Sequence, residues 1–218
     1  MLLVAHRTPA SRVRCARLAA AGARVFEVDV QLGSGGIAVS HYLPFGRGGL
    51  VQRDNWRLRW HTSALRDPEV SEVAGVVPPE CALLLDIKEK VAARRRELTA
   101  AIVETLADRA RYIVCGAQPE DLEHVRNVGF ATWRTVGGRR ELSAVLAEGG
   151  LADDGISVRH SLLTGVSLDR LHTLTSRVVA WTVNDPARAR QLRDLGADGV
   201  TTDHSGVLRA LAPEPRND

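Results

Sequence analysis

The chain has 218 residues, of which 44% are hydrophobic and 25% charged, a balance typical of a soluble globular protein. This length allows one domain with a substantial core, although an eight-unit α/β barrel usually needs about 250 residues, so any barrel here must have short loops. The net charge is only +3, and the arginines are scattered along helical stretches without interleaved aromatics, which argues against nucleic-acid binding.

Short apolar runs rich in β-formers alternate with longer runs of helical period along the whole chain. This alternation is typical of repeated βα units that build a parallel sheet. We predict strands at residues 2–6, 25–31, 82–88, 112–115, 130–136, 155–158, 178–183 and 199–202. We predict helices at residues 10–21, 63–73, 91–109, 119–128, 139–148, 167–174, 186–195 and 205–211. Asp185 followed by Pro186 is a helix-start signal, and Gly196 stands where a helix should end.

Eight βα units with right-handed crossovers favour a closed TIM (β/α)8 barrel, although an open doubly wound sheet would give much the same alternation. Residues 33–60 interrupt the pattern, with an extra extended piece at 36–41 and an irregular excursion at 46–60. We therefore expect an α/β protein with a single compact TIM-barrel domain at 1–212, a shortened insertion after the second strand, and a disordered tail at 213–218.

Membrane spans and disulfides are not indicated. No stretch approaches the ~20 consecutive apolar residues of a membrane span, and the apolar start is too short for a signal peptide. The three cysteines, at positions 15, 81 and 115, are widely spaced, as is typical of free thiols in a reducing compartment. We expect a cytoplasmic protein without stable membrane insertion; the pattern indicates no particular oligomeric state.

Charged residues gather at the ends of the first strands, where TIM barrels build their active sites. His6 and Arg7 close the first strand. In the second strand, the period of two places Glu27 and Asp29 on one face, while the apolar residues between them face the helices. Two carboxylates are therefore predicted to point into the barrel mouth.

The third predicted strand adds a carboxylate and an amine to this group. The same period turns Asp86 and Lys88 inward, and lysine is scarce in this chain, with only Lys88 and Lys90. Several converging carboxylates need a compensating cation, and oxygen ligands without cysteine favour Mg²⁺ or Ca²⁺ over zinc. Arg7 and Lys88 beside such an ion would attract a phosphate. The alternative is a buried salt-bridge network that closes the barrel.

The chain resembles the glycerophosphodiester phosphodiesterase family, a branch of the phospholipase-C-like TIM barrels. The matching residues, in family order, are His6-Arg7, Glu27-Val28-Asp29, His41 after an extended segment, Asp86-Ile87-Lys88, the run from Ala180 to Pro186, and the run from Gly196 to Asp203. Each motif is short, and their order and spacing together make the resemblance specific. It extends over nearly the whole chain.

The resemblance implies a metal-dependent hydrolysis of glycerophosphodiesters to sn-glycerol 3-phosphate and an alcohol. The residues implied to bind the divalent metal, Mg²⁺ or Ca²⁺, are Glu27, Asp29 and Asp86. It implies His6 and His41 as the acid–base pair and Arg7 and Lys88 as the phosphate-binding residues, with Trp181 as an apolar wall of the pocket. The implied partner is a small-molecule or lipid-derived phosphodiester.

Several positions depart from the family pattern. Thr8 replaces the usual Gly, the loop that normally follows is absent, Tyr42 replaces an Asp, and Asp86 stands where Glu is usual. The shortened insertion after His41 belongs to the part that recognises the alcohol. Two other hypotheses therefore stay open: a phospholipase-D-like or lyase-type reaction on another phosphorylated or lipid substrate, and a barrel that binds phosphate without turnover.

Overall fold

The computed structural model describes residues 1–33, 35–40, 43–45, 51–54, 57–60 and 67–212, and for the strands between 43 and 60 it describes the backbone alone. Eight parallel strands form the centre of the molecule: β1 (Leu2–Ala5), β2 (Val25–Leu32), β7 (Ala82–Ile87), β8 (Tyr112–Gly116), β9 (Ala131–Val136), β10 (Gly155–Arg159), β11 (Val178–Trp181) and β12 (Gly199–Thr202). All eight predicted strands are confirmed, with ends shifted by at most two residues.

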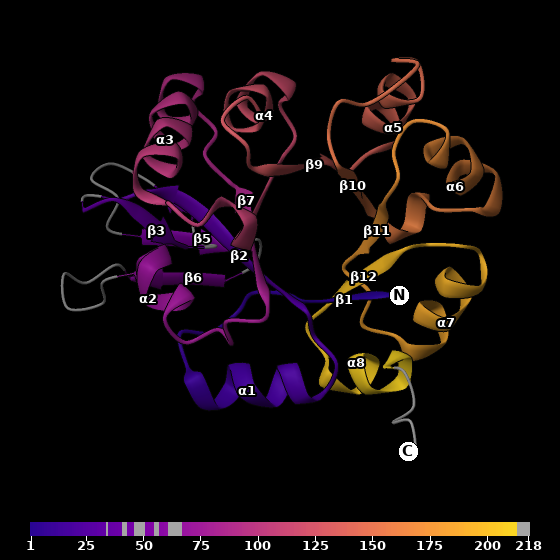
Figure 1. Cartoon of the computed structure of the whole chain (residues 1–218), viewed down its shortest axis with the longest axis horizontal. Coiled ribbons are helices and arrows are strands. Elements are labelled where there is room, and N and C mark those ends of the chain that lie inside the picture. Colours follow the sequence, from indigo (N-terminus) through magenta and orange to yellow (C-terminus); the bar gives the residue numbers. More distant parts are fainter. Residues whose placement is uncertain (34, 41–42, 46–50, 55–56, 61–66, 213–218) are drawn as a thin grey trace.

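The eight strands close into a barrel. Neighbours hydrogen-bond in the order β1, β12, β11, β10, β9, β8, β7 and β2, and β2 pairs with β1 to complete the ring (Figure 1). The closing register places Val4 opposite Val25 and Ala5 opposite Phe26. The predicted TIM barrel is therefore confirmed, and the open doubly wound sheet is excluded because such a sheet has two unpaired edges.

Helices surround the ring of strands (Figure 1). They are α1 (Arg12–Ala20), α2 (Val70–Ala74), α3 (Ala92–Thr105), α4 (Pro119–Arg126), α5 (Arg139–Val145), α6 (Gly165–His172), α7 (Pro186–Asp194) and α8 (Ser205–Leu211). The start of α7 is confirmed: the Asp185 carboxylate accepts the N–H groups of Ala187 at 3.0 Å and Arg188 at 3.3 Å. Gly196 follows with φ +95°, which glycine adopts easily. Among the described helices, none has both the length and the apolar character needed to cross a bilayer.

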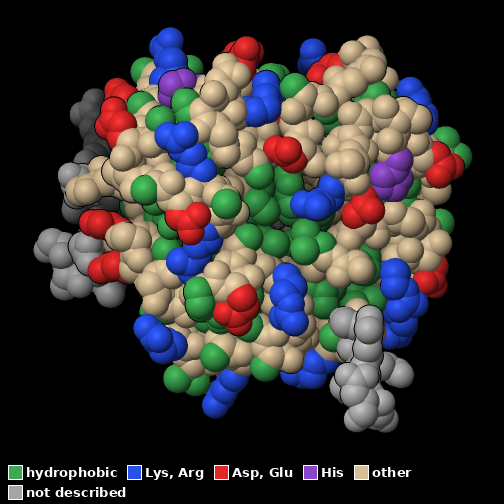
Figure 2. All heavy atoms as spheres, viewed as in Figure 1, with side chains coloured by type: hydrophobic (Ala, Val, Ile, Leu, Met, Phe, Trp, Pro, Cys, Tyr) green, Lys and Arg blue, Asp and Glu red, His purple; other side chains and the backbone are tan. Residues whose placement is uncertain are grey.

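The apolar side chains form two cores, one inside the barrel and one between barrel and helices. The inner core consists of Val4, Val25, Leu84, Ile113, Cys115, Trp133 and Val179. The outer core is larger and includes Phe26, Val28 and Leu85. Figure 2 shows hydrophobic side chains gathered at the middle of the ring, with charged side chains around them. Val25 and Phe26 thus belong to opposite faces of one strand, as the period of two predicts.

Two predicted helices differ from the structure by more than three residues at one end, whereas the ends of the other six agree within three residues. The predicted helix at 63–73 is described from residue 67 onward, and there the helix begins only at Val70. Pro68 has no N–H to donate, and the Glu69 N–H donates to Glu72 Oε2 at 2.9 Å, which sets the first turn just after it. The helix predicted at 91–109 ends at Thr105 because Leu106 turns to an extended conformation and buries its side chain.

The insertion after β2 contains more regular structure than predicted. β3 (Ile37–Val39) pairs antiparallel with β2, which agrees with the extended piece predicted at 36–41. The segment at 46–60 was predicted to be irregular, and this is wrong for its described residues. Three short strands, β4 (Leu43–Phe45), β5 (Val51–Asp54) and β6 (Arg57–Trp60), form a separate antiparallel sheet. The predicted tail at 213–218 lies outside the described residues.

Candidate active site

Charged side chains from four strands meet at the carboxyl end of the barrel. Glu27 and Asp29 lie on β2, and the strand register places Asp29 directly beside Asp86 of β7. His6 follows β1, and the register of β1 with β12 brings it next to the residues that follow Thr202. The His6 N–H donates to the Thr202 carbonyl at 2.9 Å, which fixes this junction.

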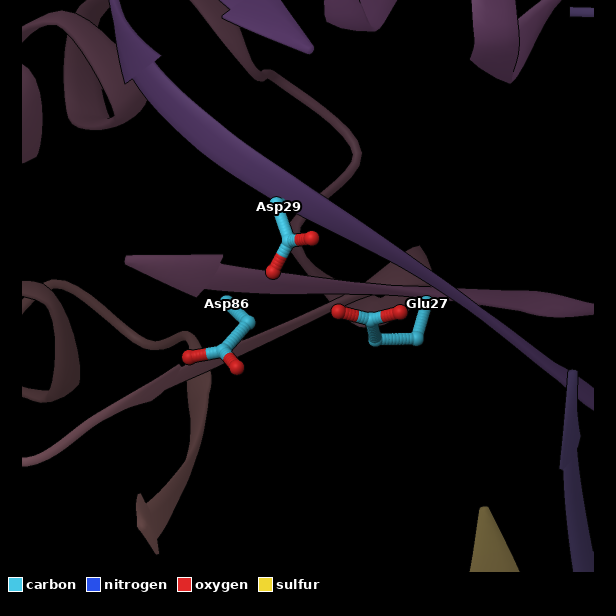
Figure 3. A group of neighbouring side chains, drawn as sticks. All are labelled: Glu27, Asp29 and Asp86. Atoms are coloured by element: carbon cyan, nitrogen blue, oxygen red, sulfur yellow. The ribbon is translucent and has the colours of Figure 1, made fainter. Parts of the chain in front are cut away.

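Glu27, Asp29 and Asp86 form a compact carboxylate cluster. One oxygen from each lies within 4.8 Å of the others, and Figure 3 shows the three carboxylates converging on a common space. Glu27 and Asp29 are each only 3% exposed. Burial, followed by the negative charges of Asp29 and Asp86, raises the pKa of Glu27 well above its ordinary value. Burial also raises the pKa of Asp86. Without a cation, the cluster therefore resists full ionisation.

Lys88 is the ammonium group within this cluster. Its Nζ lies 3.1 Å from Asp29 Oδ1 and also forms an ion pair with Asp86 Oδ2. Burial disfavours the charged amine, but the attraction of Asp86 and then of Asp29 outweighs burial, so the pKa of Lys88 is raised above its ordinary value. One ammonium group cannot neutralise three carboxylates. The donor set therefore fits a hard divalent cation, which takes oxygen ligands of this kind.

His6 is held between two carboxylates. Its Nδ1 lies 2.7 Å from Asp203 Oδ1, and its Nε2 lies 3.7 Å from Glu27 Oε2. Asn184 donates from Nδ2 to the other Asp203 oxygen at 2.7 Å and accepts the backbone N–H of Asp203 at 2.9 Å. The hydrogen bond from His6 is the main reason that the pKa of Asp203 is lowered to about 2. An ionised Asp203 accepts the Nδ1 proton of His6, which leaves Nε2 toward the cluster.

Arg7 has an unusual backbone conformation at the barrel mouth. Its φ is +51°, in the left-handed region that residues other than glycine seldom adopt. The backbone N–H of Arg7 donates to Glu27 Oε2 at 2.8 Å, so this conformation supplies a hydrogen bond to the carboxylate cluster. The next residue, Thr8, is buried and donates its N–H to the Glu27 carbonyl at 2.8 Å. The first strand is thus tied to Glu27 at two consecutive residues.

A cavity of about 230 Å³ opens beside these residues. Among the predicted site residues, those lining it are His6, Arg7, Glu27, Asp86, Lys88 and Trp181. Asp29 does not line the cavity. It belongs to the same site because it forms an ion pair with Lys88 and lies within 4.8 Å of the other two carboxylates. The indole N–H of Trp181 donates to the Ser157 carbonyl at 3.0 Å, which fixes the ring at the wall. The structure therefore brings together seven of the eight predicted site residues.

His41, the eighth predicted residue, lies outside the described residues. Ser40 immediately precedes it and donates its N–H to the Asp29 carbonyl at 2.9 Å. The Ser40 carbonyl accepts a hydrogen bond from Gln31 Nε2 at 2.8 Å. Ser40, the last described residue before His41, therefore lies beside β2 and the carboxylate cluster.

Sequence reasoning assigned no role to Asp203, Asn184 or Cys115, all of which contact the site. Asp203 directly follows the last strand, so the rule that polar residues gather at strand ends could have identified it. Cys115 lies inside the barrel, and its Sγ is 2.9 Å from Thr135 Oγ1. Burial raises the pKa of this thiol well above its ordinary value, so it lines the cavity in its neutral form.

Comparison with known proteins places the chain in a family. A search of curated proteins finds no match. Three solved structures share the fold: a glycerophosphodiester phosphodiesterase from Thermotoga maritima (20% identity, TM-score 0.70, covering 96% of this chain and 96% of that chain); a phosphodiesterase from Oleispira antarctica (18%, 0.72, 97% and 96%); and a glycerophosphodiester phosphodiesterase from Parabacteroides distasonis (17%, 0.69, 95% and 94%).

The family model for the glycerophosphoryl diester phosphodiesterase family matches residues 78–207, more than half of the 218 residues. The matched region contains Asp86, Lys88 and Trp181, together with Asn184 and Asp203. His6 and the two carboxylates of β2 precede it and join the site through barrel closure. The chain therefore belongs to the glycerophosphoryl diester phosphodiesterase family.

Proposed function

We propose that this chain hydrolyses glycerophosphodiesters to sn-glycerol 3-phosphate and an alcohol. The observation that carries the proposal is the joint placement of the carboxylate cluster, Lys88, Arg7 and His6 around one cavity at the barrel mouth. Family membership supports the reaction class. The related phosphodiesterase from Oleispira antarctica is described in complex with the product sn-glycerol-3-phosphate, which supports this choice of product.

Glu27, Asp29 and Asp86 would hold a divalent metal, Mg²⁺ or Ca²⁺. Three carboxylates within 4.8 Å of one another, two of them buried and one half-buried, face the single ammonium of Lys88 and make a strongly negative site that suits such an ion. When bound, the ion would neutralise phosphoryl oxygens and lower the barrier to attack at phosphorus. Position 86 carries Asp instead of the usual Glu, so its side chain is shorter by one methylene group. Lys88 holds the Asp86 carboxylate in place through their ion pair.

Arg7 and Lys88 would bind the phosphoryl oxygens. Both line the cavity, one with a planar guanidinium that suits two oxygens and the other with a compact charge. Negative charge builds on these oxygens in the transition state, and fixed positive groups stabilise it without reorganisation. Trp181 would form the apolar wall against the organic part of the substrate, because its ring is fixed by Ser157.

His6 and His41 would transfer the protons. In hydrolysis, the oxygen of water bonds to phosphorus, one histidine takes the water proton, the phosphorus–oxygen bond to the alcohol breaks, and the other histidine protonates the departing oxygen. The Nδ1 of His6 is engaged by Asp203, so its Nε2 is the atom that gives or takes a proton at the cavity. The segment leading to His41 begins beside Asp29, which supports its assignment to the same site.

We further propose that residues 1–212 act as one catalytic domain in the cytoplasm, with a small-molecule or lipid-derived phosphodiester as partner. The closed barrel supports one catalytic domain, because its first strand, β1, pairs directly with its last strand, β12. The three cysteines are free thiols and all are buried, which supports a reducing compartment.

The test measures release of glycerol 3-phosphate from glycerophosphocholine and glycerophosphoglycerol with Mg²⁺, Ca²⁺ or chelator. We expect release with metal, loss of release with chelator, and a decrease of about 100-fold or more in His6→Ala and Glu27→Gln. His172→Ala is the matched control, since His172 forms a similar pair with Asp198 at 2.9 Å and does not line the cavity.

Other results would favour the other hypotheses. Cleavage that yields a cyclic phosphate, or a product other than glycerol 3-phosphate, would indicate lyase-type or phospholipase-D-like chemistry. A metal-dependent rise in melting temperature without any product would indicate a barrel that binds phosphate but does not turn over.

A further inference from the structure

A second hollow adjoins the catalytic cavity on the outside of the barrel. It lies between α1 and α8, has a volume of about 470 Å³, and is lined at its upper end by His6 and Arg7. These two residues also line the catalytic cavity, so the two spaces lie side by side at His6 and Arg7. We call this hollow the α1–α8 groove. A ligand whose phosphate is bound at Arg7 can therefore extend one of its ester groups into the groove.

The walls of the groove are strongly basic. Arg14 and Arg17 project into it from α1 and Arg209 from α8, in addition to Arg7 at its upper end. Neither helix contains an acidic residue. Lys and Arg side chains are visible along the lower edge of the molecule over these two helices (Figures 1 and 2). Four guanidinium groups thus border one concave surface.

The three arginines on the helices, Arg14, Arg17 and Arg209, have no acidic partner among the described residues, where no carboxylate lies within 4.0 Å of their guanidinium groups. The acidic residue of the groove, Asp203, is already bound by His6 and Asn184. Arginines elsewhere are paired, as where Arg134 binds Asp153 at 2.9 Å. A cleft lined mainly by groups of one charge sign concentrates the electrostatic potential, so a cleft lined by arginines attracts anions.

We propose that the α1–α8 groove binds an anionic group on the alcohol part of the substrate, so that the preferred substrates are glycerophosphodiesters whose alcohol carries a further phosphate or carboxylate. This inference rests on the proposed function. Glycerol has no charge, so the anionic group must belong to the alcohol. Guanidinium groups bind phosphate and carboxylate through paired hydrogen bonds, whereas a quaternary ammonium such as choline is repelled.

The experiment compares two substrates that differ by one phosphate: glycerophosphoinositol and glycerophosphoinositol 4-phosphate. The variant is the triple substitution Arg14→Gln, Arg17→Gln and Arg209→Gln. Arg140→Gln is the control, since Arg140 is an exposed arginine of α5, which lies across the barrel from α1 (Figure 1). Unchanged melting temperatures would show that all proteins are folded.

We expect the wild type to have a higher kcat/KM for the 4-phosphate than for glycerophosphoinositol. The triple variant should lose about tenfold on the 4-phosphate and change less than about twofold on the other substrate, since each exposed ion pair contributes a few-fold at most. Higher salt should reduce the preference of the wild type. Equal kcat/KM for the two substrates in the wild type, or an equal loss on both in the triple variant, would overturn the proposal.

Failure of the proposed function gives a different result. If the wild type cleaves neither substrate, the function is wrong, and calorimetric titration of the same two compounds then decides on the groove. Tighter binding of the 4-phosphate that the triple variant loses would support it, and equal affinities would refute it. Loss of binding to phosphatidylglycerol vesicles in the triple variant, with unchanged substrate preference, would instead assign these arginines to a membrane surface and overturn the proposal.

Discussion

Replacing Asp203 with Asn would remove the carboxylate that binds His6 while nearly preserving the size of the side chain. The Asp203 carboxylate accepts a hydrogen bond from His6 Nδ1 at 2.7 Å and another from Asn184. An amide can present its NH₂ group to His6, which favours the tautomer with its proton on Nε2, the atom that faces Glu27. Neutral His6 would then carry its proton on the nitrogen that faces the cavity and could no longer accept one there.

The structure sets the scale of this effect. The pKa of Asp203 is lowered from 3.8 to about 2, which corresponds to about 2.4 kcal/mol of difference in interaction between its ionised and protonated forms. Because the Asp203 side chain is 38% exposed, solvent reduces this to about 1 kcal/mol of stability. That contribution is present at neutral pH and is lost as the pH falls from about 4 toward 2. The effect on kcat should be larger, about 10-fold to 100-fold, because orientation of His6 is lost as well.

The assay measures kcat and KM for glycerol 3-phosphate release, with melting temperature as a check of folding. The control is Asp198→Asn, since Asp198 also binds a histidine, His172 at 2.9 Å, and is 39% exposed, but lies away from the cavity. Asn184→Ala should give a smaller loss than Asp203→Asn, because it removes the two hydrogen bonds between Asn184 and Asp203 but leaves the carboxylate that binds His6. Equal kcat for Asp203→Asn and Asp198→Asn, in equally stable proteins, would refute a positioning role for Asp203.

Three further predictions concern the stability of the fold and the metal-free site. In chelator, the melting temperature should fall as the pH rises above the ordinary pKa range of a carboxyl group, because the raised pKa of Glu27 makes the folded state hold a proton that the unfolded chain releases. Mg²⁺ should remove this dependence, and Glu27→Gln should weaken it, since the pKa of Asp86 is raised as well. Gly155→Ala should destabilise the protein by about 1–3 kcal/mol, since an added Cβ would lie 2.9 Å from the Trp133 ring. Asp153→Ala should cost about 3–5 kcal/mol, because it removes the buried carboxylate of the Arg134 guanidinium and leaves it only the more distant, partly exposed Glu148 at 3.4 Å.

Matched changes separate these effects from nonspecific ones. Gly150→Ala should leave the denaturant midpoint nearly unchanged, since an added Cβ there meets no atom within 4 Å. Asp194→Ala removes a carboxylate from an exposed pair with Arg193 and should not change the melting temperature measurably. A Gly155→Ala or Asp153→Ala protein as stable as its control, or a metal-free melting temperature that rises with pH, would contradict the respective prediction.

The strands and the directions of their side chains could be predicted because they depend on local patterns. A period of two is enough to place Glu27, Asp29 and Asp86 inside the barrel, and the structure places them there. Helix ends were harder to predict, since Leu106 ends α3 by burying its side chain in a tertiary contact. The strands at 43–60 escaped prediction because three-residue and four-residue strands among glycines and arginines have no clear period.

The pairing of residues within the site could not be predicted from local patterns, because it depends on closure of the barrel. His6 and Asp203 are 197 positions apart and meet only because Ala5 lies opposite Thr202 in the register of β1 with β12. On its other side, β1 pairs with β2, which brings Glu27 to the backbone of Arg7. In an open sheet with β1 at an edge, only one of these contacts could form. The candidate site and the closed barrel therefore depend on the same two strand pairings, and a substitution that loosens either pairing should reduce activity before it unfolds the protein.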